Sequence, residues 1–473
     1  MSQVLSSAPK FSEATPPLEA SVVQLVHNLG RPHLDPAASA GLDRLLRDQI
    51  ALQIGISQLP WSKKVLAHAR SKGRAGRSHI VASNLTLSAE DAAFVNAAFG
   101  HGFEYDDAHG PSNSHPGSCV IPAAFAIGEE LGATLGEVLD AIIVGYEVYA
   151  RIGALASPDL VRRGFQPHAV LSPFGAAAVA ARLRGFDAET TLHALAIALS
   201  YASGTTEYTS SGGSIKRVHA GIGTKNGMAA ADLAQAGLTG PRAFLSGPKG
   251  FFRTFIGRPV IDSAVERFSL DKPLQIGTVW LKAYCSCYCT HSYIDAVRPH
   301  ATRLAEIERV EARITPAFNV VVGTANASAF APENIEHIQY SLPAQVAFAL
   351  LGLGNGYQVH RDYLRGKVDM APVLDLARRI SIIESADLDQ RYPGKFVGDV
   401  TLFWRDGTQQ NIFVEEPVGS LAHPLSEAEQ NAKFFELTSE VLGEPRSKAL
   451  LAELRHQDWN SKAADLMVMC GTA

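Results

Sequence analysis

The sequence predicts a mainly α-helical protein, in which a large helical domain carries an inserted, smaller α+β lid domain. Three observations predict this layout. From about Glu19 to Pro273, apolar residues recur at the spacing of amphipathic helices. From about Gly277, apolar and polar residues alternate, as they do in half-buried strands. Between Leu425 and Leu442 the helical spacing returns, so the chain is expected to re-enter the helical domain.

The length of 473 residues also favours two domains, because one hydrophobic core rarely supports so long a chain. We assign residues 1–275 and 417–473 to the helical domain and residues 276–416 to the lid. Hydrophobic residues make up 46% of the chain and charged residues 19%, which is typical of a chain that folds throughout.

Local signals mark the ends of several predicted helices. Thr134 and Glu137 form the pattern of a capping box, and the apolar residues that follow keep a helical spacing. Two further helices are expected over Phe174–Leu183 and Thr190–Ser203. Gly185 suits a left-handed end of the first, and Asp187 suits the N-cap of the second.

Strand signals appear only in the predicted lid. Alternating apolar residues indicate two strands, over Val310–Ile314 and Val400–Trp404. In Arg405-Asp-Gly-Thr408, the dipeptide Asp406-Gly407 lies between two such alternating runs and predicts a two-residue hairpin turn.

Charge and composition argue against several classes of function. The net charge of -5 provides no basic surface for nucleic acid. No apolar run approaches the roughly 20 residues that cross a bilayer, and the N-terminus is polar, so we expect a cytoplasmic protein. Cys285, Cys287 and Cys289 alternate too closely for an ordinary disulfide framework and lack the C-x-x-C spacing of metal sites, which indicates reduced thiols.

The first polar segment runs from His101 to His109 and continues to His115. Three carboxylates and three histidines lie within fifteen residues, which suits general acid–base chemistry or a metal. The structural alternative is that Asp106 and Asp107 cap the next helix. A metal is not predicted, because no recognised ligand spacing such as H-E-x-x-H is present.

Two further segments place cationic groups next to predicted helices. His168 stands just before a helix, where a substrate carboxylate would find free N–H groups. Lys216, Arg217 and His219 follow a Ser/Gly stretch that lacks the P-loop pattern, so nucleotide binding is not indicated. A lysine here can bind a carboxylate or, if burial lowers its pKa, abstract a proton. The alternatives are a loop histidine and an exposed lysine.

The fourth segment lies at the transition into the lid, where small-molecule sites tend to form between domains. It contains Lys282, Tyr284, the three alternating thiols and His291. For most of these thiols the simpler interpretation is that they are small buried apolar groups.

Several motifs recur in one order along the chain. His-x-x-x-x-Asp-Asp is followed by His-Pro-Gly, Gly-Tyr-Glu at 145–147, Phe-Gly-Ala-Ala at 174–177, Lys-x-x-His-x-Gly at 216–221, Leu-x-Gly-Pro at 238–241, and Lys-x-Tyr with His291. Together they resemble the MmgE/PrpD family, which includes 2-methylcitrate dehydratases, cis-aconitate decarboxylases and iminodisuccinate epimerases. The resemblance implies a helical domain with a lid, a homodimer, a small polycarboxylate substrate and neither a metal nor an organic cofactor. It also implies that Lys216, Lys282 and His115 line the substrate site.

Four positions depart from the family pattern. Glu104 stands where the first Asp is usual, Ala108 where Thr is common, Gln166 where His is expected, and Ala344 where Tyr is expected. These changes touch groups that would handle a leaving hydroxyl or carboxylate, whereas the lysines remain. Epimerisation needs no leaving group, so the resemblance together with these departures favours an epimerase of an imino- or amino-dicarboxylate.

In this hypothesis Lys216 and Lys282 bind carboxylates and stabilise an enediolate-like intermediate, and one of them exchanges the proton. Tyr146, Glu104, Asp106 or a thiol serves as the second acid or base. A further set is expected to contact the substrate: His115, His168, His219, Arg217 and Cys285. The alternatives are a 2-methylcitrate-type dehydratase, a cis-aconitate-type decarboxylase and a non-catalytic carboxylate-binding protein.

Overall fold

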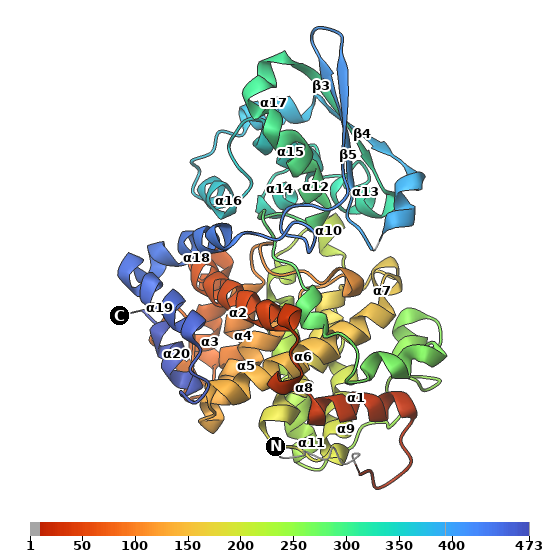
Figure 1. Cartoon of the computed structure of the whole chain (residues 1–473). Helices are drawn as coiled ribbons and strands as arrows, with labels where there is room; N and C mark the ends of the chain where they lie inside the picture. The colour runs from red at the N-terminus through yellow and green to blue at the C-terminus, as the bar shows by residue number, and fades with distance from the viewer. Residues whose placement is uncertain (1–9, 393, 473) are drawn as a thin grey trace.

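The computed structural model describes residues 10–392 and 394–472. Helices dominate it, and the lid stands on one side of a larger helical body (Figure 1). The predicted mainly helical fold with a small α+β portion is confirmed.

The helical body is built from eleven helices before the lid and three after it, within the described residues. The first set is α1 Pro17–Asn28, α2 Pro36–Ile56, α3 Pro60–Lys72, α4 Ala89–Gly100, α5 Gly117–Leu131, α6 Leu135–Ala156, α7 Asp159–Arg162, α8 Pro167–Leu183, α9 Ala188–Tyr201, α10 Tyr208–Ser211 and α11 His219–Gln235. The last set is α18 Glu427–Leu442, α19 Glu444–His456 and α20 Ala463–Met469. A two-stranded ribbon pairs β1 Ser78–His79 with β2 Thr86–Leu87.

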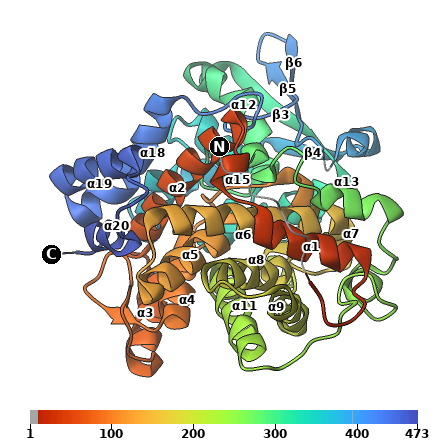
Figure 2. The same ribbon diagram turned by 60° about the horizontal axis from the view of Figure 1, so that its bottom comes forward.

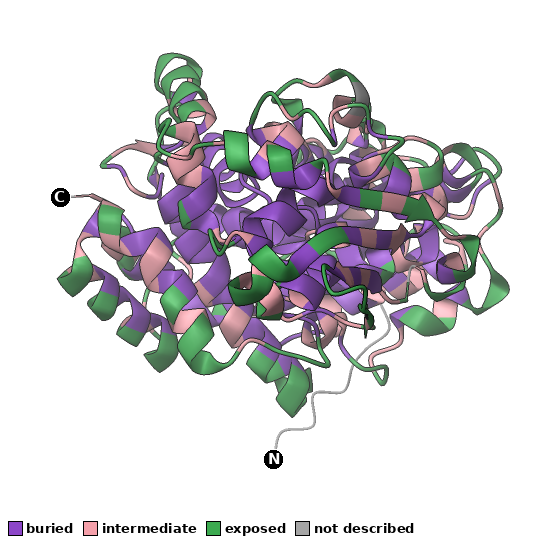
Figure 3. Ribbon diagram, turned by 90° about the horizontal axis from the view of Figure 1, so that it is seen from above, coloured by how far each residue is buried: buried purple, intermediate pink, exposed green. Residues whose placement is uncertain are grey.

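The centre of this body is a stack of alanine-rich helices. Helix α8 packs against α6, α9 and α11, and the views in Figures 1 and 2 agree on this arrangement. Gly227 on α11 allows the close approach, because a Cβ there would lie 2.3 Å from the carbonyl oxygen of Pro173 on α8. All residues of α8 from Pro167 to Ala181 are buried. Figure 3 shows the buried residues in the interior of the molecule and the exposed ones toward its edges.

The lid contains a four-stranded sheet with helices on it. Its helices are α12 His291–Val297, α13 Pro316–Val322, α14 Ile335–Gln339, α15 Leu342–Leu350, α16 Tyr357–Leu364 and α17 Ala371–Ala377. Its strands are β3 Ile307–Ile314, β4 Ile380–Glu384, β5 Gly398–Trp404 and β6 Gln409–Val414. The strand order is β4-β3-β5-β6, with β4 parallel to β3 and the other neighbours antiparallel.

The two parts have separate hydrophobic clusters. The lid cluster gathers the inward residues of β3 and β5, such as Val310 and Leu402, together with Phe348 of α15. The cluster of the helical body also includes residues of α18 and α19, which pack on α2 (Figure 1). The C-terminal helices thus lie on the helical body, and the exact boundaries at 275/276 and 416/417 remain our proposal.

The local signals in the sequence have the expected outcomes, with two corrections. Thr134 and Glu137 form a capping box, and Asp187 accepts a hydrogen bond from the Thr190 N–H at 2.8 Å. Asp406 and Gly407 do lie in a hairpin turn, but Trp404 N donates to Thr408 O at 2.9 Å, so the loop has three residues rather than the predicted two. The predicted start at Phe174 was wrong, because Pro167 begins α8 and the Gln166 side chain caps it. His168 therefore lies in the first turn of α8 rather than before it.

Candidate active site

Four segments far apart in the sequence meet at the junction of the helical body and the lid. They are the loop after α4, the turn Ile215–Val218 before α11, the segment that enters the lid at 280–285, and the end of α14. Residues of three of these segments line the pocket, together with Tyr208 and Thr209 of α10; they include His101, Glu104, Lys216, Arg217, Gln339 and Tyr340. Lys282 is not among the lining residues and reaches the site through its contact with Glu104. The free volume of the pocket, about 20 Å³, holds roughly one water molecule, so side chains nearly fill it.

Glu104 is the residue on which the pocket converges. Its Oε1 contacts the Lys216 ammonium and accepts a hydrogen bond from the Tyr340 hydroxyl at 3.0 Å, and its Oε2 lies 3.1 Å from Lys282 Nζ. The side chain is buried, and the backbone adopts φ +54°, which is unfavourable for a residue with a Cβ. Such strain is concentrated at functional sites in proteins.

Asp106 and His101 form a buried pair beside Glu104. Asp106 Oδ2 accepts a hydrogen bond from His101 Nδ1 at 2.6 Å, while Oδ1 lies 3.8 Å from Lys282 Nζ and 3.9 Å from His115 Nδ1. The carboxylate therefore fixes the proton of His101 on Nδ1 and leaves Nε2 with a lone pair. This Nε2 is buried and has no partner among the described residues.

Two further histidines lie close to His101. The His168 ring centroid is 4.3 Å and the His115 centroid 5.4 Å from that of His101. His168 is held between Tyr149, 2.7 Å from Nδ1, and Ser118, 3.1 Å from Nε2. Burial lowers the pKa of all three histidines, so the neutral imidazoles dominate at pH 7.

Lys216 has the environment of a lysine that can act as a base. Its side chain is 7% exposed. Burial, followed by the nearby positive charges of Lys282 and Arg217, lowers the pKa of Lys216 well below its usual value. His219 directly follows the turn Ile215–Val218 and is the first residue of α11. Burial and the positive charge of Lys216 lower the pKa of His219 to about 4.

Arg217 lines the pocket and Cys285 lies beside it, next to Gln339, but the polar groups of both residues bind other parts of the protein. Arg217 Nε lies 2.6 Å from Glu336 Oε1, and another nitrogen of the guanidinium donates to the Gly102 carbonyl. The guanidinium carbon lies 3.7 Å from the centroid of the Trp61 ring. Cys285 donates its thiol proton to the Phe103 carbonyl oxygen at 2.9 Å. Burial raises the pKa of Cys285, so this thiol stays protonated.

Tyr146 supports the loop rather than lining the pocket. Its hydroxyl donates to Asp107 Oδ2 at 3.0 Å, and Asp107 also accepts from the Gly117 N–H at the start of α5. Asp107 thus caps α5, which is the structural alternative considered for this segment. Both side chains are buried, and neither belongs to the residues that line the pocket.

Cys287 differs from its neighbour Cys285. A hydrogen bond from Cys289 and the positive charges of Lys282 and Lys216 lower its pKa to about 7. Sequence reasoning could not single out this thiol, because three cysteines alternate there with identical local spacing.

Several pocket residues were absent from the predicted set. His101 is the first residue of the histidine- and carboxylate-rich segment at 101–115, and its place in that segment could have identified it as a site residue. Tyr340, Gln339 and Glu336 come from the lid, more than a hundred residues after Lys216 and Arg217. Their sequence context shows only a short helix, so no local pattern identifies them.

The positions that depart from the family pattern have structural explanations. Gln166 accepts a hydrogen bond from the Ala169 N–H at 2.5 Å and so acts as the N-cap of α8. Ala108 pairs with Trp280 through two backbone hydrogen bonds. Ala344 is buried on α15 in the lid, while Tyr340, four residues earlier and directly after α14, supplies a hydroxyl to the pocket.

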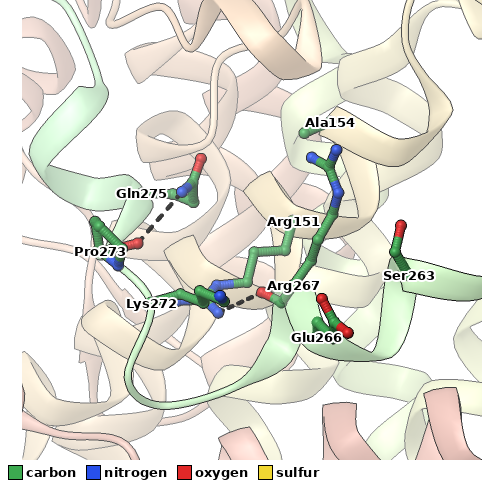
Figure 4. A pocket seen from close by; sticks show the side chains of 8 residues that line it. All are labelled: Arg151, Ala154, Ser263, Glu266, Arg267, Lys272, Pro273 and Gln275. Atoms are coloured by element: carbon green, nitrogen blue, oxygen red, sulfur yellow. Dashed lines mark hydrogen bonds between the residues drawn. The ribbon is translucent and has the colours of Figure 1, made fainter.

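A larger pocket lies elsewhere, between α6 and the segment 263–275 (Figure 4). Its lining includes Arg151, Arg267 and Lys272, with Glu266 on the same wall. Arg151 is already paired with Glu147 at 2.7 Å and donates to the Arg267 carbonyl. None of its lining residues belongs to the site around Glu104.

Comparison with known proteins identifies the family. The MmgE/PrpD N-terminal domain matches residues 20–263, and the MmgE/PrpD C-terminal domain matches residues 284–458. The chain belongs to the MmgE/PrpD family. The family resemblance predicted from the motifs is thereby confirmed.

Similar members of the MmgE/PrpD family include named enzymes. A cis-aconitate decarboxylase of Aspergillus terreus is 27% identical over 459 residues, which is 93% of each chain. A cis-aconitate decarboxylase-like protein of Aspergillus oryzae is 25% identical, over 90% of this chain and 91% of the relative. The cis-aconitate decarboxylase of Mus musculus is 26% identical, over 74% of this chain and 72% of the relative.

No helix in the described residues is long and apolar enough to span a membrane. No group of three or more His, Cys, Asp or Glu side chains in residues 10–392 and 394–472 is arranged to hold a metal ion.

Proposed function

We propose that this protein moves a proton on the carbon beside a carboxylate of an amino- or imino-dicarboxylate, and that the net reaction is an epimerisation. The observation that carries the proposal is the convergence of Lys216 and Lys282 on the single carboxylate of Glu104. Two lysines that share one carboxylate can also hold a substrate carboxylate, and the ammonium of Lys282 can offset the negative charge that develops on it.

The charge balance of the site supports a substrate that contains nitrogen. Even with both lysines protonated, their charges only balance those of Glu104 and Asp106, and Arg217 is balanced by Glu336. A tricarboxylate would therefore enter a buried site without a surplus of positive charge, which is costly. A protonated amine or imine on the substrate would instead pair with Glu104.

The proposed chemistry uses two proton carriers. Neutral Lys216 takes the α-proton, and the electron pair of the broken C–H bond moves into the carboxylate to give an enediolate that Lys282 stabilises. His101 returns a proton to the opposite face of the carbon in the minor fraction of molecules that carry it protonated, because burial keeps most of the imidazole neutral while Asp106 stabilises the imidazolium. In the reverse direction His101 starts neutral and Lys216 starts as the ammonium, so protons balance in both directions.

Decarboxylation of a cis-aconitate-type acid is the second candidate. Similar family members are named cis-aconitate decarboxylases, and this candidate is also favoured by Tyr340 and His168, which supply a hydroxyl and an imidazole near the pocket despite the departures at Ala344 and Gln166. In that reaction the C–C bond to a carboxylate breaks, carbon dioxide leaves, and a proton is added to the carbon.

Incubation of the purified protein in deuterated water separates these functions. With an imino- or amino-dicarboxylate, epimerisation places deuterium on the α-carbon of the product without releasing carbon dioxide or forming an alkene. Release of carbon dioxide from cis-aconitate would support the second candidate. Binding of dicarboxylates without exchange of any proton would support a non-catalytic binding protein.

A further inference from the structure

Lys433, a buried lysine of the C-terminal segment, contacts the backbone of two site segments without lining the pocket. Lys433 lies on α18, which follows the lid in sequence, and is 5% exposed. Its ammonium donates to the carbonyl oxygen of Tyr105 at 2.9 Å and to that of Lys282 at 3.1 Å, and lies 2.7 Å from Asp48 Oδ1 on α2.

These three contacts use the whole hydrogen-bonding capacity of the ammonium group, which has three N–H donors and no acceptor. Lys433 therefore has no donor left for a substrate and does not line the pocket. Its charge is compensated by Asp48 and by the ring of Tyr105, whose centroid is 4.0 Å from Nζ. A lysine so fully engaged fixes the groups that it binds.

The two carbonyls belong to the backbone that carries the site. Tyr105 lies between Glu104 and Asp106, and Lys282 is itself the lysine that contacts both carboxylates. One ammonium thus ties together the segments that supply three of the charged side chains. The backbone pair between Ala108 and Trp280 joins the same two segments a few residues further along.

We propose that Lys433 is a positioning residue, which holds the Glu104 loop and the Lys282 segment in register; this inference rests on the proposed function of the site. The loop needs such a restraint, because Glu104 is held at a positive φ that a free chain would leave. Displacing a reacting group by about 1 Å can reduce a rate on the order of 100-fold.

The test compares variants that remove different parts of the arrangement. Lys433→Met removes both carbonyl contacts, whereas Asp48→Asn removes the ion pair but leaves the ammonium on the carbonyls. We expect kcat for α-proton exchange to fall on the order of 100-fold in Lys433→Met and to stay within a few fold of wild type in Asp48→Asn. Lys448→Met, at a 63% exposed side chain on α19, is the matched control and should leave kcat unchanged.

The double variant Asp48→Asn/Lys433→Met separates positioning from stability. Removing both partners of a buried ion pair is often nearly neutral for folding, so its Tm should recover toward that of wild type while kcat stays low. Wild-type kcat in Lys433→Met or in the double variant would overturn the proposal, as would an equal loss in Asp48→Asn. If Lys433→Met does not fold, Lys433→Gln takes its place in the same comparison.

Hydrogen exchange of backbone amides tests the same restraint without any assay of turnover. Peptides covering residues 101–109 and 280–286 should exchange faster in Lys433→Met than in wild type or Asp48→Asn, while peptides of α8 should not change. If the wild-type protein exchanges no substrate proton, the proposed function fails, and this measurement alone decides the role of Lys433. Equal exchange in the three proteins would overturn that role.

Discussion

The ammonium of Lys282 lies 3.1 Å from Oε2 of Glu104, and the other oxygen of the same carboxylate contacts Lys216. The protein thus places one of its own carboxylates where two lysines converge. A substrate carboxylate that binds these lysines must share them with Glu104 or displace it. This relationship governs both the affinity and the selectivity expected of the site.

Glu104→Gln should change the selectivity toward more negative ligands. The substitution removes one negative charge next to both lysines, so the affinity for a tricarboxylate such as citrate should rise about tenfold, equivalent to roughly 1.4 kcal/mol. The affinity for an amino-dicarboxylate should fall, because its nitrogen loses a partner. Isothermal titration with both ligands measures the two changes, and a parallel change for both would contradict the charge-balance argument.

Lys216→Met should abolish proton transfer while leaving the fold intact. A positioned general base typically contributes about 10²- to 10⁴-fold to a rate, so α-proton exchange should fall within that range. Methionine keeps the length of the buried side chain, and Tm should change little. Exchange followed by NMR in deuterated water gives the rate, with Lys448→Met as the surface control. An undiminished rate would assign the proton to another group.

His101→Asn should affect one face of the substrate carbon. If His101 carries the proton on the face opposite Lys216, the variant should still exchange the α-proton of one epimer, because Lys216 remains, but it should not convert that epimer into the other. Chiral chromatography combined with mass spectrometry distinguishes exchange from conversion. Conversion at the wild-type rate would exclude His101 as the second proton carrier.

The pH dependence should report the lowered pKa of Lys216. Only the neutral amine abstracts a proton, so α-proton exchange of the epimer that Lys216 attacks, which needs no proton from His101, should rise with pH and level off well below the usual lysine value of 10.5. In Glu104→Gln the ammonium loses a neighbouring carboxylate, so this rise should move to lower pH. A pH–rate profile of kcat/KM for both proteins tests the direction of the change.

Cys287 should react more readily than Cys285 at neutral pH. Hydrogen bonding from Cys289 and the two nearby lysines lower the pKa of Cys287 to about 7, whereas burial raises that of Cys285. Iodoacetamide should therefore alkylate Cys287 with a rise centred near pH 7, as peptide mass spectrometry would show. Preferential labelling of Cys285 would contradict this assignment.

Much of the fold follows from local sequence. Three features depend on contacts between residues close in sequence: the capping box at Thr134, the cap at Asp187 and the Asp-Gly turn at Asp406. Their patterns can therefore be recognised without knowledge of the rest of the chain. The start of α8 was misplaced because Gln166 is an uncommon cap and Pro173 lies inside the helix, where proline normally indicates an end.

The site was less accessible to sequence reasoning. Lys216, Lys282, Glu104 and Asp106 were expected from motifs, and they do come together. Whether His115, His168 and His219 touch the substrate remains a prediction, as do the roles of Tyr146 and Cys285, whose side chains are engaged internally. Tyr340 and Lys433 reach the site only through tertiary contacts, which no local pattern encodes.

The most direct measurement follows the α-proton of an imino- or amino-dicarboxylate incubated with the protein in deuterated water. The proposed function predicts deuterium on the α-carbon, growth of the second epimer, and loss of both in Lys216→Met. Formation of an alkene or of carbon dioxide in place of the second epimer, or the absence of any exchange while the ligand binds, would contradict it.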